Sequence, residues 1–379
     1  MKTEQRRWSN ANGWENPFTS ELSQSVQVVF VFGSLPEFIN ENWLTSLKKT
    51  FPKAILFGCS TAGEIYGTQV TDETVVATAV HFEKTKIQVS GIQLAKAEES
   101  FHAGEELAKA LEKTGLVHVI VLSDGLNVNG SELVAGLSKR LPTNVTVTGG
   151  LSGDGDRFKE TFVVWKGAMQ SHTITILGLY GEHLRVGYGS LGGWDSFGPE
   201  RLITKSRGNV LYELDGKSAL ELYKNYLGEH AKELPASGLL FPLSLRTKEG
   251  ESGVVRTILA VDEDEQSMTF AGDVPEGAYA RLMKANFDHL IDGAVGAAKT
   301  SYEAIGSSSP DLALLISCVG RKLVLKQRIE EEVEGVRDVL GEKTVLMGFY
   351  SYGEISPFTP SAKCELHNQT MTITTLSER

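Results

Sequence analysis

Two short segments of the sequence place a glutamate directly after a glycine. GCSTAGEI spans Gly58–Ile65 and GFYSYGEI spans Gly348–Ile355, so Glu64 and Glu354 occupy the same position. A carboxylate in apolar surroundings is costly unless it is paired, and two such groups could bind the cationic or amino group of a ligand. Acidic side chains in turns also accept hydrogen bonds from their own turn. The sequence leaves both interpretations open.

Other polar side chains follow predicted strands. Arg321 lies in SCVGRK, and Asp124 and Asn127 lie in SDGLNVNG. Binding sites in open α/β sheets lie beyond the carboxyl ends of strands, which is where these residues fall. Arg321 could bind a ligand carboxylate through two hydrogen bonds, or it could pair with Glu354. An internal salt bridge is the alternative for Arg321, and a structural role is the alternative for Asp124 and Asn127.

Cys59 lies in the first glycine–glutamate segment and would be the nucleophile of a hydrolase. The surrounding GCSTAG does not match the G-x-S-x-G pattern of a nucleophile on a sharp turn, and no histidine is near it in the sequence. A catalytic cysteine needs a base. The equivalent position in the second segment is Phe349, which favours a packing role for Cys59.

The elements that would position these residues recur three times. Each copy begins with an apolar run, at 26–32, 117–122 and 312–319, which predicts a strand buried on both faces. A helix-like stretch, a second strand, a glycine–acid turn and a further strand follow. In the second copy the turn contains Gly153-Asp154. We predict an α/β protein with internal strand–helix–strand–turn–strand repeats and mixed β-sheets flanked by helices.

The segment between the second and third copies has a different character. It is rich in turns and leads into a predicted helix, Lys217–Leu227, which follows an Asp215-Gly216 turn. We therefore divide the chain into a polar N-terminal arm (1–25), a first α/β domain (26–210) and a second α/β domain (211–379).

Composition excludes several classes of partner. The net charge is -11 over 379 residues, and no large basic cluster is present, so nucleic acid and anionic membrane surfaces are poor partners. The 3 cysteines are far apart and form no C-x-x-C pair, which indicates a reducing compartment. No apolar run approaches the roughly 20 residues of a membrane span, and the N-terminus is polar. We expect a cytoplasmic protein that does not insert into membranes.

The order of these motifs resembles that of the FIST-domain proteins, a bacterial sensory family with an N-terminal and a C-terminal FIST region. The N-terminal region is represented by FGCSTAGEI, TGGLSGDGDRF and SLGGWDSFGPERLITKSRGNVLYELDG. The C-terminal region is represented by SCVGR, MGFYSYGEISP and ELHNQTMT. The resemblance implies a ligand-sensing module that acts on histidine kinases, chemotaxis receptors or cyclic-di-GMP enzymes. We expect a free-standing copy, because no kinase, cyclase or coiled-coil segment follows.

Free-standing members that are similar in layout are implied to bind haem, sense nitric oxide and inhibit a partner histidine kinase. Among 8 histidines, His367 in ELHNQTMT is the first candidate for the axial ligand and His102 in FHAGEEL is the second. A histidine at the start of a strand is also commonly hydrogen-bonded within the fold. Asn368 is a further candidate ligand-binding residue. We expect no cofactor other than haem.

We expect a sensor rather than an enzyme, with a small-molecule ligand and a histidine kinase or other signalling enzyme as partner. A second copy of the chain is a further candidate partner. The alternative ligand is amino-acid-like, with Arg321 binding its carboxylate and Glu354 or Glu64 its amine. A hydrolase that uses Cys59 is the remaining alternative. The visible spectrum of the purified protein separates haem from the other ligands, because only haem gives a Soret band. If His367 is the axial ligand, that band should change in His367→Ala.

Overall fold

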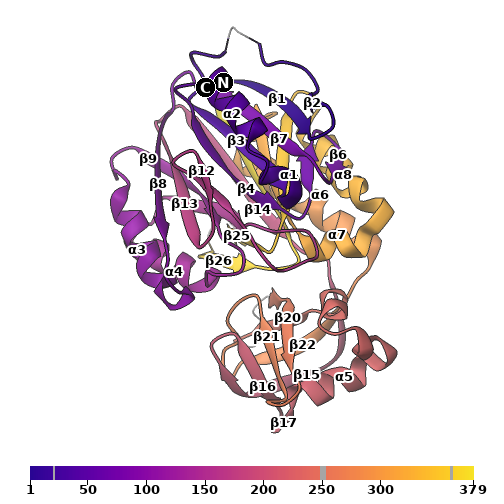
Figure 1. Ribbon diagram of the computed structural model, residues 1–379. Helices are drawn as coiled ribbons and strands as arrows, with labels where there is room; N and C mark the ends of the chain where they lie inside the picture. Colours follow the sequence, from indigo (N-terminus) through magenta and orange to yellow (C-terminus); the bar gives the residue numbers. More distant parts are fainter. Residues whose placement is uncertain (20–21, 248–252, 359–361) are drawn as a thin grey trace.

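The computed structural model describes residues 1–19, 22–247, 253–358 and 362–379, and these residues form four β-sheets. Three mixed sheets and their helices make a core. The fourth sheet belongs to a separate domain, residues 195–284, which is inserted between the second and third repeats and lies below the core in Figure 1. The predicted α/β class with mixed sheets is confirmed.

The core sheets are built as follows. The first has the order β12-β11-β4-β3-β7-β1-β2, with β1 (Lys2–Ser9), β2 (Gly13–Trp14), β3 (Val28–Ser34), β4 (Ile55–Thr61), β7 (Val75–His81), β11 (Val163–Trp165) and β12 (Ala168–Gln170). The second has the order β26-β25-β10-β9-β13-β8, with β8 (Lys86–Gln93), β9 (Leu116–Ser123), β10 (Thr146–Leu151), β13 (Thr173–Tyr180), β25 (Gly353–Pro357) and β26 (Cys364–His367). The third has the order β14-β27-β23-β24-β5-β6, with β5 (Glu64–Tyr66), β6 (Gln69–Thr71), β14 (Leu184–Leu191), β23 (Leu312–Cys318), β24 (Val345–Ser351) and β27 (Met371–Glu378).

The helices of the core are α1 (Leu35–Phe38), α2 (Asn42–Thr50), α3 (Ser100–Ala110), α4 (Gly130–Arg140), α6 (Phe287–Ala304), α7 (Val319–Leu325) and α8 (Ile329–Leu340). Short 3₁₀ turns lie at Ala97–Glu99 and Lys326–Arg328. No helix in the described ranges combines the length and the apolar character that a membrane crossing needs.

Each repeat places two parallel strands side by side. The parallel pairs are β3 with β4, β9 with β10, and β23 with β24. β7, β13 and β27 lie antiparallel on the other side of each pair. Phe30 and Phe32 of β3 contact an apolar cluster shared by all three sheets, whereas Val29 and Val31 pack with Leu47 of α2. Both faces of these strands are covered, which explains their continuous apolar runs.

The strand after each turn leaves its own sheet and joins that of another repeat. β5 follows β4 but pairs with β24 of the third repeat. β25 follows β24 but pairs with β10 of the second repeat, and β11 follows β10 but pairs with β4 of the first. The exchange is cyclic, so no repeat completes its own sheet.

A second exchange closes the cycle through the two ends of the chain. β8 follows β7 into the second sheet, where it pairs with β13, and β14 follows β13 into the third sheet, where it pairs with β27. β1 supplies the corresponding strand of the first sheet by pairing with β7. The Met1 amino group lies 3.3 Å from the Glu378 carboxylate, and both termini are at one end of Figure 1. The expected N-terminal arm therefore includes a strand of the first sheet.

The second strand of each parallel pair has a glycine at the same register. Gly58, Gly149 and Gly348 each lie opposite a residue of the partner strand. A Cβ added to any of them would lie 1.8 or 2.0 Å from that residue's carbonyl oxygen. A side chain at these positions would force the parallel strands apart.

The inserted domain has its own apolar core, formed around Ile203, Leu220, Tyr223 and Phe270. It contains β15 (Asp195–Arg207), β16 (Val210–Leu214), β17 (Lys217–Ser218), α5 (Ala219–Leu227), β18 (Leu243–Arg246), β19 (Val254–Arg256), β20 (Ile258–Asp262), β21 (Ser267–Phe270) and β22 (Tyr279–Lys284), with 3₁₀ turns at Gly228–Glu233 and Ala236–Leu240. The predicted helix is thus α5, whose first two expected residues form β17. The expected boundary between 210 and 211 passes through this domain, because the chain leaves the core after β14 and returns at α6.

We expect Gly58→Ala to lower the free energy of unfolding by about 3 kcal/mol, because its methyl group overlaps the Val31 carbonyl oxygen. Gly67→Ala is the matched control, since Gly67 has nothing within 4 Å of its added Cβ and only a positive φ of 62°. We expect it to cost about 1 kcal/mol. Denaturant unfolding followed by circular dichroism measures both, and equal losses would contradict the close-approach argument.

Candidate functional site

The two predicted glutamates are buried, and each is hydrogen-bonded by one residue of its own turn and by one residue of a later segment. Thr61 Oγ1 lies 2.5 Å from Glu64 Oε1, and Thr74 Oγ1 lies 2.6 Å from Glu64 Oε2. Ser351 Oγ lies 2.5 Å from Glu354 Oε1, and Thr370 donates to Glu354 Oε2 through its backbone N–H and its hydroxyl. Both side chains have 0% exposure, so their contacts are with the chain itself.

Burial raises the pKa of Glu64 and that of Glu354 from 4.5 to about 8, although hydrogen bonds from hydroxyl and amide groups act in the opposite direction. Each of the two carboxyls therefore retains a proton at neutral pH. A neutral carboxyl does not attract the ammonium group of a ligand. The arrangement matches the structural interpretation of these residues.

Asp154, the acid of the second copy, organises the loop that follows β10. Its carboxylate accepts hydrogen bonds from the backbone N–H groups of Phe158, Lys159 and Glu160, and from the Tyr352 hydroxyl. Asp154 occupies the position that Glu64 and Glu354 occupy in the other two copies, but its backbone hydrogen-bond donors lie in the loop that follows β10.

Asp124 and Asn127 form the loop between β9 and α4. Asp124 Oδ1 accepts hydrogen bonds from the backbone N–H groups of Leu126 and Asn127 and from the Thr161 hydroxyl, and its Oδ2 accepts from the His172 N–H. The Asn127 side-chain amide lies 3.3 Å from both carboxylate oxygens. These contacts fix the loop from which α4 begins.

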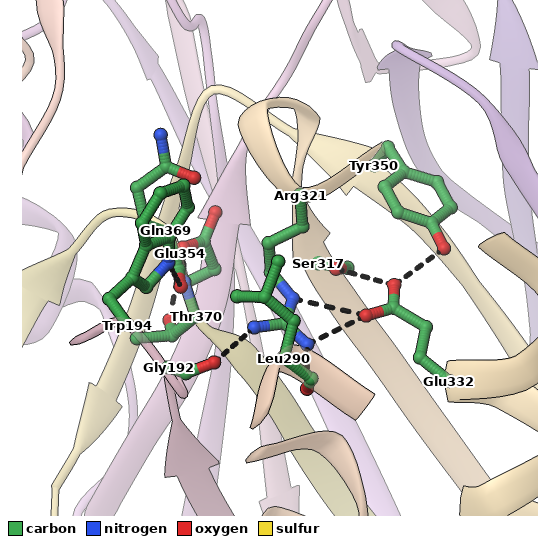
Figure 2. Close-up of polar contacts among 10 residues, drawn as sticks. All are labelled: Gly192, Trp194, Leu290, Ser317, Arg321, Glu332, Tyr350, Glu354, Gln369 and Thr370. Carbon is green, nitrogen blue, oxygen red and sulfur yellow. Dashed lines mark hydrogen bonds and ion pairs between the residues drawn. The ribbon is translucent and has the colours of Figure 1, made fainter. Parts of the chain in front are cut away.

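Arg321 pairs with Glu332 rather than with Glu354. Its Nε and Nη2 lie 3.1 and 2.7 Å from Glu332 Oε2, and both side chains have 0% exposure. Nη1 donates to the Gly192 carbonyl and Nη2 donates to the Leu290 carbonyl. Figure 2 shows the guanidinium between these groups, with Glu354 on the other side of Arg321. The guanidinium that was predicted to bind a ligand carboxylate through two hydrogen bonds is therefore already bound to groups of the protein itself.

This ion pair anchors the inserted domain. Gly192 lies just before the chain enters that domain, and Leu290 lies in α6 just after the chain returns. Glu332 Oε1 also accepts from the Ser317 and Tyr350 hydroxyls, at 3.0 and 2.7 Å. One buried charge network therefore holds both crossings of the chain against the third sheet.

The two candidate histidines do not fit a haem. His367 Nε2 donates to the Ser356 carbonyl at 2.8 Å, its ring is 2% exposed, and burial lowers its pKa to about 4. His102 lies on the outer surface of α3 with a side-chain exposure of 71%. Neither lines the two cavities described below. The described residues contain no group of three or more His, Cys, Asp or Glu side chains that could hold a metal ion.

Cys59 lies in the apolar cluster between the sheets, paired with Val163 across β4 and β11. Burial raises the pKa of its thiol. The environment opposes formation of the thiolate that a cysteine nucleophile requires.

Two cavities lie between the inserted domain and the second sheet. The first, of about 490 Å³, is lined by residues that include Ser131, Val134, Leu245, Arg256, Asp273 and Leu366. The second, of about 460 Å³, is lined by residues that include Leu126, Asn129, Phe270, Gly272 and Tyr352. Both volumes are in the range of small-molecule sites. Both cavities use α4, so the loop held by Asp124 positions one wall of each.

Polar contacts between the domain and the core lie beside these cavities. Arg256 Nη1 donates to the Leu366 carbonyl at 2.8 Å, and the Asn129 side-chain amide lies 3.3 Å from Asp273 Oδ1. The predicted residue Asn368 is part of the same contact: its Oδ1 accepts from the Thr257 N–H, and its Nδ2 donates to the Tyr352 carbonyl. Of the sequence-predicted residues, Asn368 therefore contacts the inserted domain directly.

Sequence reasoning missed Arg256 and Asp273. The available signal was a single arginine inside the apolar run VVRTIL, whose burial needs local partners. Arg256 is 7% exposed, and burial lowers its pKa to about 10, so it stays protonated at neutral pH.

Comparison with known families agrees with this architecture. The FIST N domain model matches residues 27–217, and the FIST C domain model matches residues 219–357. This chain belongs to the FIST family. Membership indicates a sensory role in signal transduction. The two FIST matches meet at residue 218, at the end of β17, so the inserted domain is divided between FIST N and FIST C.

One relative and two solved structures complete the comparison. The uncharacterized protein MJ1623 of Methanocaldococcus jannaschii is 24% identical in an alignment of 355 residues that covers 86% of this chain and 65% of that protein. The FIST chain thus spans less than two thirds of that relative. A cyanuric acid hydrolase from A. caulinodans aligns with a TM-score of 0.40 and 8% identity, covering 100% of this chain and 99% of that one. A second cyanuric acid hydrolase structure aligns with a TM-score of 0.33, 8% identity and the same coverage.

We expect Arg321→Met to lower the free energy of unfolding by about 3–5 kcal/mol, because it leaves the buried Glu332 charge without its partner. Arg328→Met is the matched control, since Arg328 pairs with Asp288 and Glu331 at the surface, where ion pairs contribute little. Thermal and denaturant unfolding compare the two variants. An equal effect of both would show that the buried network is not the anchor.

The raised pKa values of Glu64 and Glu354 predict a pH dependence. Each carboxyl of the folded protein keeps its proton up to about pH 8, whereas the same group in the unfolded chain loses it near pH 4.5. The contribution of each group to the free energy of unfolding is therefore complete below pH 4.5 and is lost as the pH rises through about 8. Between these values stability falls by at most ~1.4 kcal/mol per pH unit for each carboxyl. Unfolding measured from pH 5 to 8 should show this slope, and Glu64→Gln with Glu354→Gln should flatten it. An unchanged slope in the double variant would contradict these assignments.

Proposed function

We propose that the chain is a sensor that binds a small molecule between its inserted domain and the second sheet. The observation that supports this is the pair of cavities beside the polar contacts that dock the inserted domain. A ligand that fills either cavity contacts both parts of the chain at once. Its binding energy can therefore change how firmly the inserted domain is held.

The two cavities together form a cleft between the inserted domain and the second sheet. Hydrogen bonds connect the inserted domain with the segment at residues 192–194, where the chain leaves the core. Gln369, at φ 64°, donates from its side chain to the Leu239 carbonyl of the inserted domain, and its own carbonyl accepts from Trp194 Nε1 at the first crossing. The next residue, Thr370, binds Glu354. Two adjacent residues, Gln369 and Thr370, thus contact the inserted domain, the first crossing and the turn that holds Glu354. Figure 2 shows both residues beside Trp194 and Glu354.

The receiver in this proposal is a separate signalling enzyme, with a histidine kinase as the first candidate. A cytoplasmic location is part of the proposal, since Cys59, Cys318 and Cys364 are all free thiols. Haem is not part of it, because His367 is engaged by Ser356. The amino-acid-like ligand of the sequence analysis would need a cation other than Arg321, and Arg256 lies in the cleft.

Hydrogen exchange of the whole chain tests the proposal. We expect a mixture of low-molecular-mass metabolites, including amino acids, organic acids and nucleosides, to protect peptides that cover 125–138, 254–259, 270–278 and 363–369. Peptides around Glu64 serve as the internal control and should not change. Protection around Glu64 without protection of the cleft would overturn this location of the site.

A further inference from the structure

Arg256 has one nitrogen that no other group uses. Its Nε donates to the Asp273 carbonyl, and its Nη1 donates to the Val255 and Leu366 carbonyls. No hydrogen bond or ion pair between described residues involves Nη2. The residue lines the first cavity and is only 7% exposed. A guanidinium carries its charge on all three nitrogens and binds oxyanions through their N–H groups.

A second polar group without a partner lies beside it. The Ser131 hydroxyl is buried and has no hydrogen-bond partner among the described residues. It lies 3.2 Å from the point that a Cβ on Gly272 would occupy, and Arg256 Nε lies 2.8 Å from that same point. The absence of a side chain at Gly272 leaves room where the hydroxyl and the guanidinium approach each other. Both residues line the first cavity.

The remaining lining suits an apolar molecule with a single negative charge. Val134, Leu245, Pro275 and Leu366 contribute apolar surface to the cavity. Asp273, Glu365 and Lys363 also line it, and the two carboxylates act on the charge of Arg256. Two nearby carboxylates oppose a doubly charged phosphate more strongly than a singly charged carboxylate.

We infer that the first cavity binds a small organic carboxylate, whose oxygens accept hydrogen bonds from Arg256 Nη2 and the Ser131 hydroxyl and whose hydrocarbon part contacts Val134, Leu245 and Leu366. This inference rests on the proposed function, because it names the ligand class of the same cleft.

Calorimetric titration of the full chain tests the inference. The probes are the linear carboxylates from acetate to octanoate, phenylacetate, and phenyl phosphate, with the primary amide of each carboxylate as its neutral control. We expect at least one carboxylate to bind, its amide to bind at least tenfold more weakly, and phenyl phosphate to bind no more tightly than phenylacetate. Equal affinity for a carboxylate and its amide, or binding of phenyl phosphate alone, would overturn the inference.

Variants then locate the site. Ser131→Ala removes a hydroxyl that has no internal partner, so it should leave the melting temperature unchanged and weaken carboxylate binding about threefold or more. Arg256→Lys should weaken it about tenfold or more. Arg185→Gln, an exposed residue of β14 outside the cavity lining, is the charge-matched control and should have no effect. Unchanged affinity in both Ser131→Ala and Arg256→Lys would overturn the inference.

The outcomes also separate this inference from the proposed function. Protection of the cleft by the metabolite mixture, without binding of any carboxylate probe, would overturn the ligand class and leave the sensory cleft standing. Absence of both would overturn the two together.

Discussion

The cyclic exchange of strands is the constraint on which the rest of the structure depends. Each turn is hydrogen-bonded to the next repeat: Ala62 N–H donates to the Tyr350 carbonyl, Gly153 N–H to the Ser60 carbonyl, and Tyr352 N–H to the Leu151 carbonyl. Turns locked in this way need acids that accept hydrogen bonds within the protein. The repeated acidic residues therefore belong to the architecture, and burial that holds Glu64 and Glu354 neutral agrees with that role.

The inserted domain depends on this core without belonging to it. Its two crossings are held by one buried arginine, and its inner surface meets the second sheet through a few polar contacts beside two cavities. The contact between the inserted domain and the second sheet has few direct hydrogen bonds and lies beside two cavities, so a ligand can readily change it. The proposed sensing site is therefore this junction, where a ligand would contact both parts of the chain.

The sequence predicted the repeated part of the fold because its signals are local. Apolar runs predicted β3, β9 and β23, and the aligned turns predicted the equivalence of Glu64 and Glu354. Strand exchange could not be predicted, because the sequence pattern of a strand after a turn is the same whether it pairs within its own repeat or in the sheet of another repeat. The partner of Arg321 was also undetermined, since Glu332 lies on a helix whose other acids face solvent. Arg256 was missed because its neighbours come from distant parts of the chain.

The central claim is that a ligand in the cleft changes the placement of the inserted domain. Pulsed electron paramagnetic resonance on spin labels at Lys217→Cys in the inserted domain and Lys109→Cys in α3, with Cys364→Ala to remove the partly exposed thiol, measures that placement. We predict that a ligand which protects the cleft in hydrogen exchange also shifts or narrows the distance distribution. A ligand that binds in the cleft and leaves the distribution unchanged would contradict it.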